Sequence, residues 1–335
     1  MKQLMKRGIT GLILLCVILV CYIIWDNRRF IIVEQEIKID DLPEEFEGFT
    51  ILQISDLHEK VFGSGQEKLI QAVNAIDYDA IIFTGDMQNG SINYGPFYSL
   101  IEGIENKKHA LYIKGNADPE NYQSDMQKPF VKSEFIKGME RRGVQLLESN
   151  YTIKRGSEGI HFIDFELSAK ADIQGQIDML NNRSIPENAV YRDHLNARFD
   201  HQTKLLEDIS FLDKSDQSEV FIALNHYPVV DKRIDQLNST PGSVFRPFDL
   251  IVAGHYHGGQ IRLPFLGALF VPEAWYERNG FLPPQDRVKG LWTYKGTRQY
   301  VSAGLGSSDF VPFLNFRFLN PPEINVLTLI GKHRE

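Results

Sequence analysis

Five short apolar runs in this chain each end in a polar motif rich in aspartate or histidine. The motifs are Asp56-Leu57-His58, Gly85-Asp86, Gly115-Asn116, Asn225-His226 and Gly254-His255-Tyr256-His257. Apolar runs of four to eight residues bounded by turn residues are typical of buried strands. Helical periodicity at 67–76 and 131–143 predicts helices that alternate with these strands. The pattern predicts an α/β fold in which the polar motifs gather at the carboxyl ends of the strands.

The remaining stretches complete one expected domain. Residues 30–39 alternate weakly and predict a first strand. Residues 168–213 are polar with two helical patterns, which predicts a helical excursion that serves as a lid over the site or as an inert surface insertion. Two late apolar stretches, 298–302 and 324–329, predict strands of a second sheet. The sequence contains no internal repeat or interdomain linker, so residues 30–335 are expected to form a single domain.

The first 29 residues differ in character from the rest. An apolar stretch runs from Gly8 to about Trp25, and Arg28 and Arg29 follow it. Its length lies at the short end of the roughly 17–25 residues that a membrane-spanning helix needs. A cleaved signal peptide is the alternative, but the stretch lacks an Ala-x-Ala-like cleavage site. We therefore predict an uncleaved, single-pass anchor in the cell membrane over residues 1–29, with Trp25 at the interface.

The charges and the positions of the cysteines limit where the protein is located and what it binds. Three positive charges precede the apolar stretch and two follow it, which slightly favours a cytoplasmic N-terminus and an extracytoplasmic body. The net charge is −8 and no basic run occurs outside the N-terminus, so nucleic-acid binding is not expected. Both cysteines, Cys16 and Cys21, lie in the apolar stretch, which excludes a disulfide framework or a zinc–thiolate site in residues 30–335.

The side chains at the strand ends are candidate metal ligands. The spacing of His255 and His257 lets both imidazoles point the same way from an extended backbone, and imidazole is the commonest side-chain metal ligand. Taken alone, that stretch is equally typical of a turn with two solvated histidines, and a lone strand-end aspartate is usually a turn or a cap. Five such ends in one order favour a shared site. The candidate residues are Asp56, His58, Asp86, Asn116, His226, His255 and His257.

In order and spacing, these motifs closely resemble those of the calcineurin-like metallophosphoesterase superfamily. The similarity spans roughly residues 50–257. The late segments Gly304-Leu305-Gly306 and 318–324 resemble those of its membrane-anchored, cell-surface branch. The resemblance implies a four-layer αββα sandwich of two mixed sheets, combined here with an N-terminal transmembrane helix.

The same resemblance implies two divalent metal ions, Mn, Fe or Zn, as cofactors. Two ligand sets are implied, with Asp86 bridging them: Asp56, His58 and His257 for one ion, and Asn116, His226 and His255 for the other. Asp86 and Asn116 are the implied catalytic residues. Mixed imidazole, carboxylate and amide ligands suit these metals better than they suit a soft thiophilic ion.

The implied activity is that of a metal-dependent phosphoric ester hydrolase acting on a phosphodiester or a phosphomonoester. A hydroxide that bridges the two ions, and whose formation the ions favour near neutral pH, would attack phosphorus. The expected partners are the membrane and a phosphoester, with lipid-linked and cell-wall-linked substrates as options. Tyr256 and Gln260 are candidate substrate contacts, with structural packing as the alternative for both; the substrate-binding residues are otherwise unassigned.

One position departs from the family pattern. The family sequence continues Gly-Asn-His, whereas Ala117 follows Asn116 here. That histidine assists the leaving group or the transition state, and general acid help is worth about 10²–10⁴-fold. Two alternatives therefore stay open: a pyrophosphatase on a lipid-linked nucleotide, similar to UDP-diacylglucosamine hydrolases, and a non-catalytic metal-bound binding module. His194 and His201 in the excursion are candidates for compensation, and Asp118 is expected to keep a structural hydrogen-bonding role.

Overall fold

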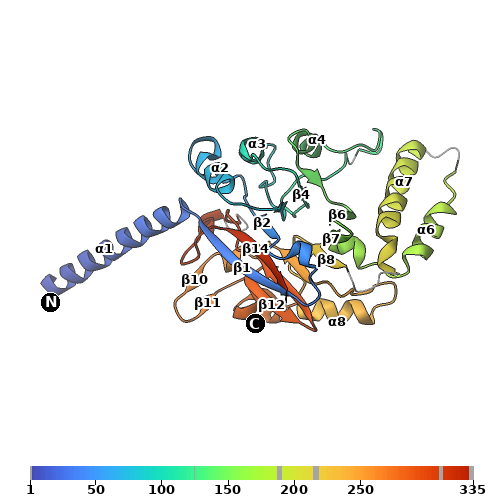
Figure 1. Ribbon diagram of the computed structural model, residues 1–335. Helices are drawn as coiled ribbons and strands as arrows, with labels where there is room; N and C mark the ends of the chain where they lie inside the picture. Colours follow the sequence, from blue (N-terminus) through green and yellow to red (C-terminus); the bar gives the residue numbers. More distant parts are fainter. Residues whose placement is uncertain (1, 124, 187–190, 214–218, 309–311, 332–335) are drawn as a thin grey trace.

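Two six-stranded mixed sheets pack face to face in the computed structural model, with helices on the two outer faces (Figure 1). The structure describes residues 2–123, 125–186, 191–213, 219–308 and 312–331. A layer of buried aliphatic and aromatic side chains from both sheets fills the space between them, including Ile51, Ile82, Leu111, Ile160, Ile222 and Leu250. The architecture is the αββα sandwich that the resemblance implies.

The first sheet supplies three of the five polar motifs. Its strands lie in the order β1 (Ile31–Ile39), β14 (Glu323–Gly331), β2 (Thr50–Ile54), β3 (Ala80–Phe83), β4 (Ala110–Tyr112) and β5 (Gln145–Leu146). Strands β2 to β5 are parallel, and β14 runs antiparallel to β2. Its outer face is covered by α2 (Glu67–Asn74), α3 (Gly95–Gly103) and α4 (Glu134–Glu140), whose apolar sides join the same buried cluster as the strands. The predicted alternation of strands and helices is confirmed here.

The second sheet supplies the other two motifs. Its strands lie in the order β12 (Gly290–Tyr294), β13 (Thr297–Val301), β9 (Leu250–Ala253), β8 (Val220–Leu224), β7 (Glu158–Asp164) and β6 (Asn150–Arg155). The four central strands are parallel, and both edge strands are antiparallel to their neighbours. Apolar residues of α5 (Phe165–Ser168) and α8 (Asp231–Ser239) pack on its outer face.

The polar excursion contains the two predicted helices. They are α6 (Ile173–Asn181) and α7 (Arg192–Ile209), which pack against each other through a small apolar cluster of their own. Figure 1 shows the pair at the side of the sandwich, away from α1. Residues 187–190 of the predicted excursion lie outside the described residues.

One strand assignment was wrong, and several elements were missed. Residues 298–302 fall in the second sheet as predicted, but 324–329 belong to β14, which lies in the first sheet between β1 and β2. An apolar run does not reveal which sheet it joins, because pairing depends on distant backbone groups. The sequence interpretation also omitted α8, β12 and a small hairpin, β10 (Arg262–Leu263) with β11 (Gly267–Ala268).

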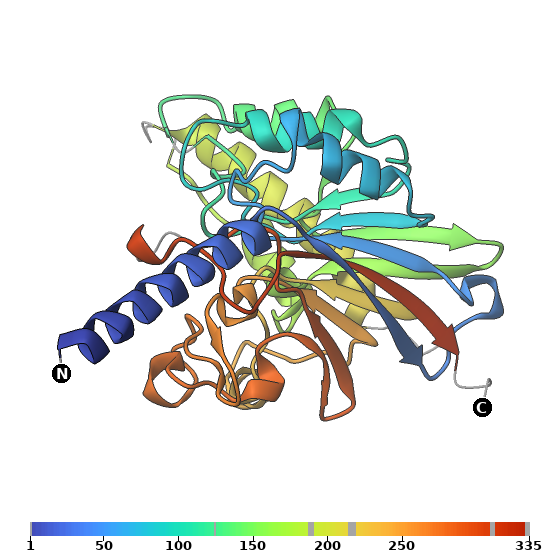
Figure 2. The same ribbon diagram turned by 90° about the vertical axis from the view of Figure 1, so that its left-hand side faces the viewer.

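The N-terminal segment forms one long helix, α1 (Lys2–Asn27), that projects away from the sandwich (Figures 1 and 2). Its 23 residues Met5–Asn27 are long and apolar enough to cross a membrane, a property that a signal sequence shares. At 1.5 Å per residue they extend roughly 34 Å, compared with about 30 Å for the hydrocarbon core of a bilayer. The helix is therefore a candidate membrane span.

Candidate metal centre

The five polar motifs meet at one end of the sandwich, where strands of both sheets end. Asp56 and His58 follow β2, Asp86 follows β3 and Asn116 follows β4, all in the first sheet. The histidines 226, 255 and 257 follow β8 and β9 of the second sheet. The sequence predicted that the motifs gather at the carboxyl ends of strands, without indicating which sheet each strand joins. The site lies between two sheets, because the carboxyl ends of both sets of parallel strands face the same way.

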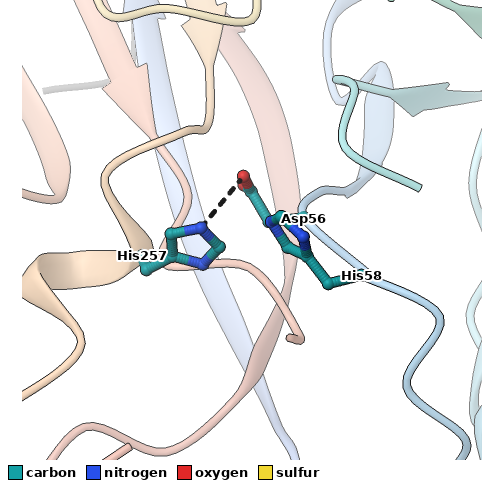
Figure 3. A group of neighbouring side chains, drawn as sticks. All are labelled: Asp56, His58 and His257. Carbon is teal, nitrogen blue, oxygen red and sulfur yellow. Dashed lines mark ion pairs between the residues drawn. The ribbon is translucent and has the colours of Figure 1, made fainter. Parts of the chain in front are cut away.

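Asp56, His58 and His257 form the first group of candidate ligands (Figure 3). One ligand atom from each lies within 4.8 Å of the others. The carboxylate oxygen Oδ1 of Asp56 is 3.8 Å from Nε2 of His257, and the two imidazole rings are 4.9 Å apart between centroids. Asp56 is fully buried and His257 nearly so, which keeps these polar atoms away from bulk water.

Asp86, His226 and His255 form the second group, with the same 4.8 Å limit on their ligand atoms. Nε2 of His226 lies 3.1 Å from Nδ1 of His255 and 3.1 Å from Oδ1 of Asn116. Asn116 therefore joins this group through its amide oxygen. It is also exposed, so the centre is open to solvent on this side.

Asp86 connects the two groups. Its Oδ2 atom lies 3.3 Å from Nε2 of His226 in the second group and 3.4 Å from Nε2 of His58 in the first. All seven residues predicted from the sequence are thus brought together around this one carboxylate.

Neighbouring hydrogen bonds orient two of the rings toward the centre. Nδ1 of His58 contacts Oδ1 of Asn89 at 3.0 Å, and Nδ1 of His226 contacts the carbonyl oxygen of Thr84 at 2.8 Å. These contacts leave the Nε2 atoms facing inward, as in many metal sites. Among the described residues, the buried Nε2 of His58 and Nδ1 of His257 have no hydrogen-bond partner. Buried nitrogens without partners, next to two carboxylates, fit a bound cation.

The electrostatics also suit a cation. Burial acts to raise the pKa of Asp86, but His226 and His58 outweigh it and lower that pKa to about 2, so the carboxylate stays charged. Burial, reinforced by His226, lowers the pKa of His255 to about 3, and burial also lowers the pKa of His257. Both imidazoles are therefore neutral near pH 7, which is the form that binds metal ions.

Glycine precedes three of the motifs because no larger residue fits. A Cβ atom on Gly85 would lie 2.6 Å from the amide nitrogen of Gly115 and 2.7 Å from the ring of His226. One on Gly115 would collide with Asp86, and one on Gly254 would collide with Ser55 and lie 2.5 Å from the carboxylate of Asp56. The missing side chains let the strand ends approach closely enough for the ligand atoms to meet.

Comparison with known proteins identifies the family at this point. The family model described as calcineurin-like phosphoesterase matches residues 49–259, which include all seven residues of the centre. The chain belongs to the calcineurin-like phosphoesterase family. As a member of that family it is a metal-dependent phosphoester hydrolase, and its two groups of ligand-type side chains are candidate metal sites.

Individual relatives of this phosphoesterase are distant. An uncharacterized metallophosphoesterase of Bacillus subtilis (strain 168), YkuE, is 27% identical over 305 residues, which cover 88% of this chain and 84% of YkuE. The phosphodiesterase YaeI of Escherichia coli (strain K12) is 31% identical over 84 residues, 25% of this chain and 26% of YaeI. Among solved structures, the phosphopantetheinyl hydrolase PptH of Mycobacterium tuberculosis has 14% identity and a TM-score of 0.37, covering 76% of this chain and 89% of PptH.

Sequence reasoning missed two residues that support the centre of this phosphoesterase. Arg317 is completely buried, and its guanidinium donates to the carbonyl oxygens of Gly306, Ala303 and His257. Asn320 is also buried and donates to the carbonyl of His257 at 2.7 Å. Both residues lie in the loop between β13 and β14 and hold it against the turn that carries His257. A buried arginine leaves no local signal in a sequence, although Asn320 lies in the segment that resembled the cell-surface branch.

The position that departs from the family pattern keeps its backbone role. The amide nitrogen of Ala117 donates to Oδ1 of Asp86 at 2.7 Å. The carboxylate of Asp118 accepts hydrogen bonds from the amide nitrogens of Asp86, Gln88 and Gly115. The structural, hydrogen-bonding role predicted for Asp118 is therefore confirmed.

His194 and His201, the candidates to compensate for the histidine missing at position 117, form hydrogen bonds with other residues. Nδ1 of His194 lies 2.8 Å from the carbonyl oxygen of Lys128, and Nε2 of His201 lies 2.8 Å from the hydroxyl of Tyr122. These contacts join α7 to the loop that follows Asn116 and give neither histidine a place among the candidate ligands.

Tyr256 and Gln260, the two candidate substrate contacts, serve packing in this structure. Tyr256 is 1% exposed, and its hydroxyl donates to Oε2 of Glu273 at 2.6 Å. The amide of Gln260 donates to the carbonyls of Ser308 and Leu314. A more accessible side chain is that of Tyr227, which is 42% exposed and stacks edge-on against the His255 ring at 4.4 Å.

Proposed function

We propose that this phosphoesterase is anchored in the membrane and uses two metal ions to hydrolyse a phosphodiester or a phosphomonoester. The observation that carries the proposal is the position of Asp86, whose Oδ2 lies within 3.4 Å of a histidine nitrogen in each ligand group. A carboxylate within reach of both ligand groups could bridge a pair of cations about 3.5–4 Å apart.

The ligand assignment follows the two groups. Asp56, His58 and His257 would hold one ion, Asn116, His226 and His255 would hold the other, and Asp86 could serve both. Nitrogen and hard oxygen donors with no thiolate suit Mn, Fe or Zn. Bound there, the ions would lower the pKa of a water molecule and neutralise charge on the phosphoryl oxygens.

The chain's own residues set the geometry of the reaction. Asn89 and Thr84 fix the tautomers and directions of two ligand rings through their Nδ1 atoms. Asp86 and Asn116 are the residues that we assign to catalysis. Asn116 is the exposed member of the centre, so its amide lies where a phosphate group arriving from solvent can contact it.

A diester is favoured over a monoester. The family relative YaeI is called a phosphodiesterase, although its similarity covers only 25% of this chain. The lack of a histidine at position 117 is consistent with a substrate whose leaving group needs little protonation.

The membrane part of the proposal rests on α1. The helix is exposed from Met5 to Cys21, which is most of the apolar span Met5–Asn27. Its flanking charges, three before and two after, favour an extracytoplasmic catalytic domain. Protease added outside intact cells should digest the domain while the protein stays in the membrane pellet after alkaline extraction. Release into the supernatant would contradict anchoring.

The function is tested with the full-length protein in detergent and bis(4-nitrophenyl) phosphate. We expect hydrolysis that depends on Mn²⁺, Zn²⁺ or Fe²⁺ and that falls at least about 10²-fold in Asp86→Asn. The matched control is Asp235→Asn, the same carboxylate-to-amide change on α8, where Asp235 pairs with Lys295 outside the centre. The control should keep wild-type turnover. Absence of hydrolysis with all three metals would contradict the proposal.

A further inference from the structure

A cavity of about 460 Å³ lies between the end of α1 and the metal centre. Ile23, Ile24 and Arg28 at the end of the helix form one side of it. His58, a member of the first ligand group, lines the other side together with Lys60. A volume of this size is typical of small-molecule sites. The cavity therefore connects the candidate centre to the place where α1 leaves the domain.

The C-terminal end of α1 is held against the domain by side-chain contacts, so the wall of the cavity that it forms has a defined position. The side-chain amide of Asn27 donates to the carbonyl of Arg317 at 2.8 Å, and the Arg317 amide nitrogen donates back to Oδ1 of Asn27 at 2.8 Å. Tyr22 packs edge-to-face against Phe318, with ring centroids 6.1 Å apart. Arg317 also contacts the carbonyl of His257. One residue thus joins the helix end to the turn that carries a candidate ligand.

The lining combines apolar side chains with the guanidinium of Arg28 and with the neutral polar residues Asn27, Ser307 and Asn315. Ile23 and Ile24 lie on the helix side and Phe316 is also part of the lining, while Arg28 supplies positive charge and Nζ of Lys60 donates to the carbonyl of Leu305 at 3.2 Å. None of the described lining residues is acidic, and the described residues offer Arg28 no ion-pair partner. A site with apolar side chains on the helix side and a guanidinium that has no ion-pair partner among the described residues suits an anionic group joined to a hydrocarbon chain.

The position of the cavity along α1 indicates where such a chain would come from. Ile23 and Ile24 lie within the last five residues of the span Met5–Asn27. When that span crosses a bilayer, its end lies at the membrane surface, beside the aromatic anchor Trp25. The cavity then opens at the level of the lipid headgroups.

We propose that this cavity binds the non-reacting part of a phosphoester substrate that is itself a lipid, with its hydrocarbon chain remaining in the bilayer beside Ile23 and Ile24. The inference rests on the proposed function, since it names the substrate class of the same centre. In the reaction, the oxygen of water forms the new bond to phosphorus, the bond from phosphorus to the leaving oxygen breaks, and the proton that water loses passes to the leaving oxygen or to solvent. The lipid product stays in the membrane.

The test compares two substrates that lose the same leaving group. Full-length protein is reconstituted in phosphatidylcholine vesicles, and hydrolysis of hexadecyl 4-nitrophenyl phosphate and methyl 4-nitrophenyl phosphate is followed by release of 4-nitrophenolate. We expect the wild type to prefer the hexadecyl ester by kcat/KM. Ile24→Asn and Ile23→Asn should each lower the hexadecyl-to-methyl ratio about tenfold, because each puts a polar group against the chain.

The matched control is Ile32→Asn, an exposed isoleucine on β1 outside the cavity lining, which should leave the ratio unchanged. Turnover of the methyl ester reports whether each variant is folded. An unchanged ratio in both cavity variants, or a wild type that prefers the methyl ester, would overturn the inference while the proposed function stands. If the wild type hydrolyses neither ester with any of the three metals, the proposed function fails and the inference fails with it.

Discussion

At the scale of single residues, backbone strain gathers at the centre. Five of the seven candidate ligands have positive φ values between 46° and 67°: Asp56, His58, Asp86, His255 and His257. Non-glycine residues in this region cost on the order of 1–3 kcal/mol each and persist where the surrounding structure enforces them. These left-handed conformations change the direction of the backbone where the strands end, so that the ligand side chains face the centre. Strain concentrated at one place is typical of a functional site.

The same scale gives a prediction for Ala117. Restoring the family histidine, in Ala117→His, should return proton donation to the leaving group. Hydrolysis of aryl phosphodiesters with poor leaving groups should then rise by about 10²-fold, while that of 4-nitrophenyl esters changes little. The measurement is the slope of log kcat/KM against the pKa of the leaving phenol, which should be shallower in the variant.

Ala117→Gln is the control for this slope, since it adds bulk and a hydrogen-bond donor without a proton that is lost near pH 7. If the plots of log kcat/KM against leaving-group pKa have the same slope in wild type and in Ala117→His, the added histidine does not donate a proton to the leaving group. Metal binding without hydrolysis in either protein would instead favour the non-catalytic alternative.

At the scale of elements, α7 is tied to the loop that follows Asn116. His201 on α7 contacts the hydroxyl of Tyr122 at 2.8 Å and a carboxylate oxygen of Glu148 at 3.3 Å. Tyr122 also stacks on Phe130, with ring centroids 4.3 Å apart. The excursion therefore braces a loop next to the centre, which is compatible with a lid and with an inert support.

His201→Ala should loosen that loop. Amide hydrogen exchange of Gln123 and Ser133, which bond across the loop to Val131 and Asn121, should become about tenfold faster. His109→Ala is a matched control, because His109 contacts the hydroxyl of Tyr151 at 2.9 Å elsewhere in the fold. Exchange that stays at wild-type rates would contradict the bracing role. A fall in kcat/KM alongside faster exchange would distinguish a lid from an inert insertion.

Asp164, at the start of α5, gives a prediction about pH. Its carboxylate caps the helix by accepting from the amide of Leu167 at 2.7 Å, and burial raises its pKa to about 7. In the unfolded chain the pKa is about 4, so the folded state binds more protons between these two values. The free energy of unfolding therefore falls as the pH rises through this window.

Asp164→Asn keeps a capping side chain and removes the titration. Its Tm relative to wild type should be higher at pH 8 than at pH 4, by on the order of 2–5 °C. Asp172→Asn, at the exposed cap of α6, is the control and should show the same Tm difference at both pH values. A pH-independent difference for Asp164→Asn would contradict the assignment.

At the scale of the whole molecule, the centre joins the two sheets, so metal binding should stabilise the entire sandwich. An ion present at 100 times its Kd adds about 2.7 kcal/mol to the free energy of unfolding. Chelation should then lower the Tm by on the order of 5 °C, as measured by calorimetry on the full-length protein. In Asp86→Asn the shift should largely disappear. Equal shifts in wild type and variant would place the metal elsewhere.

The sequence by itself determined the α/β alternation, the excursion helices and the seven residues of the candidate centre. These features are local: a buried strand requires an apolar run, and three of the five strand-end motifs begin with a glycine that precedes the polar residue. Gly85-Asp86 and Gly254-His255 show this directly, since the structure has no room for a Cβ atom before either polar residue.

Only the tertiary structure decided which sheet each strand joins and what surrounds the centre. The run that forms β14 is equally compatible with either sheet, and its place between β1 and β2 depends on backbone pairing with residues about 270 to 290 positions away. Arg317 contributes through three carbonyl groups that no sequence pattern connects. The cavity beside α1 exists because the first and last parts of the chain meet there. Such contacts depend on chain folding over long distances, whereas sequence patterns report only on neighbours.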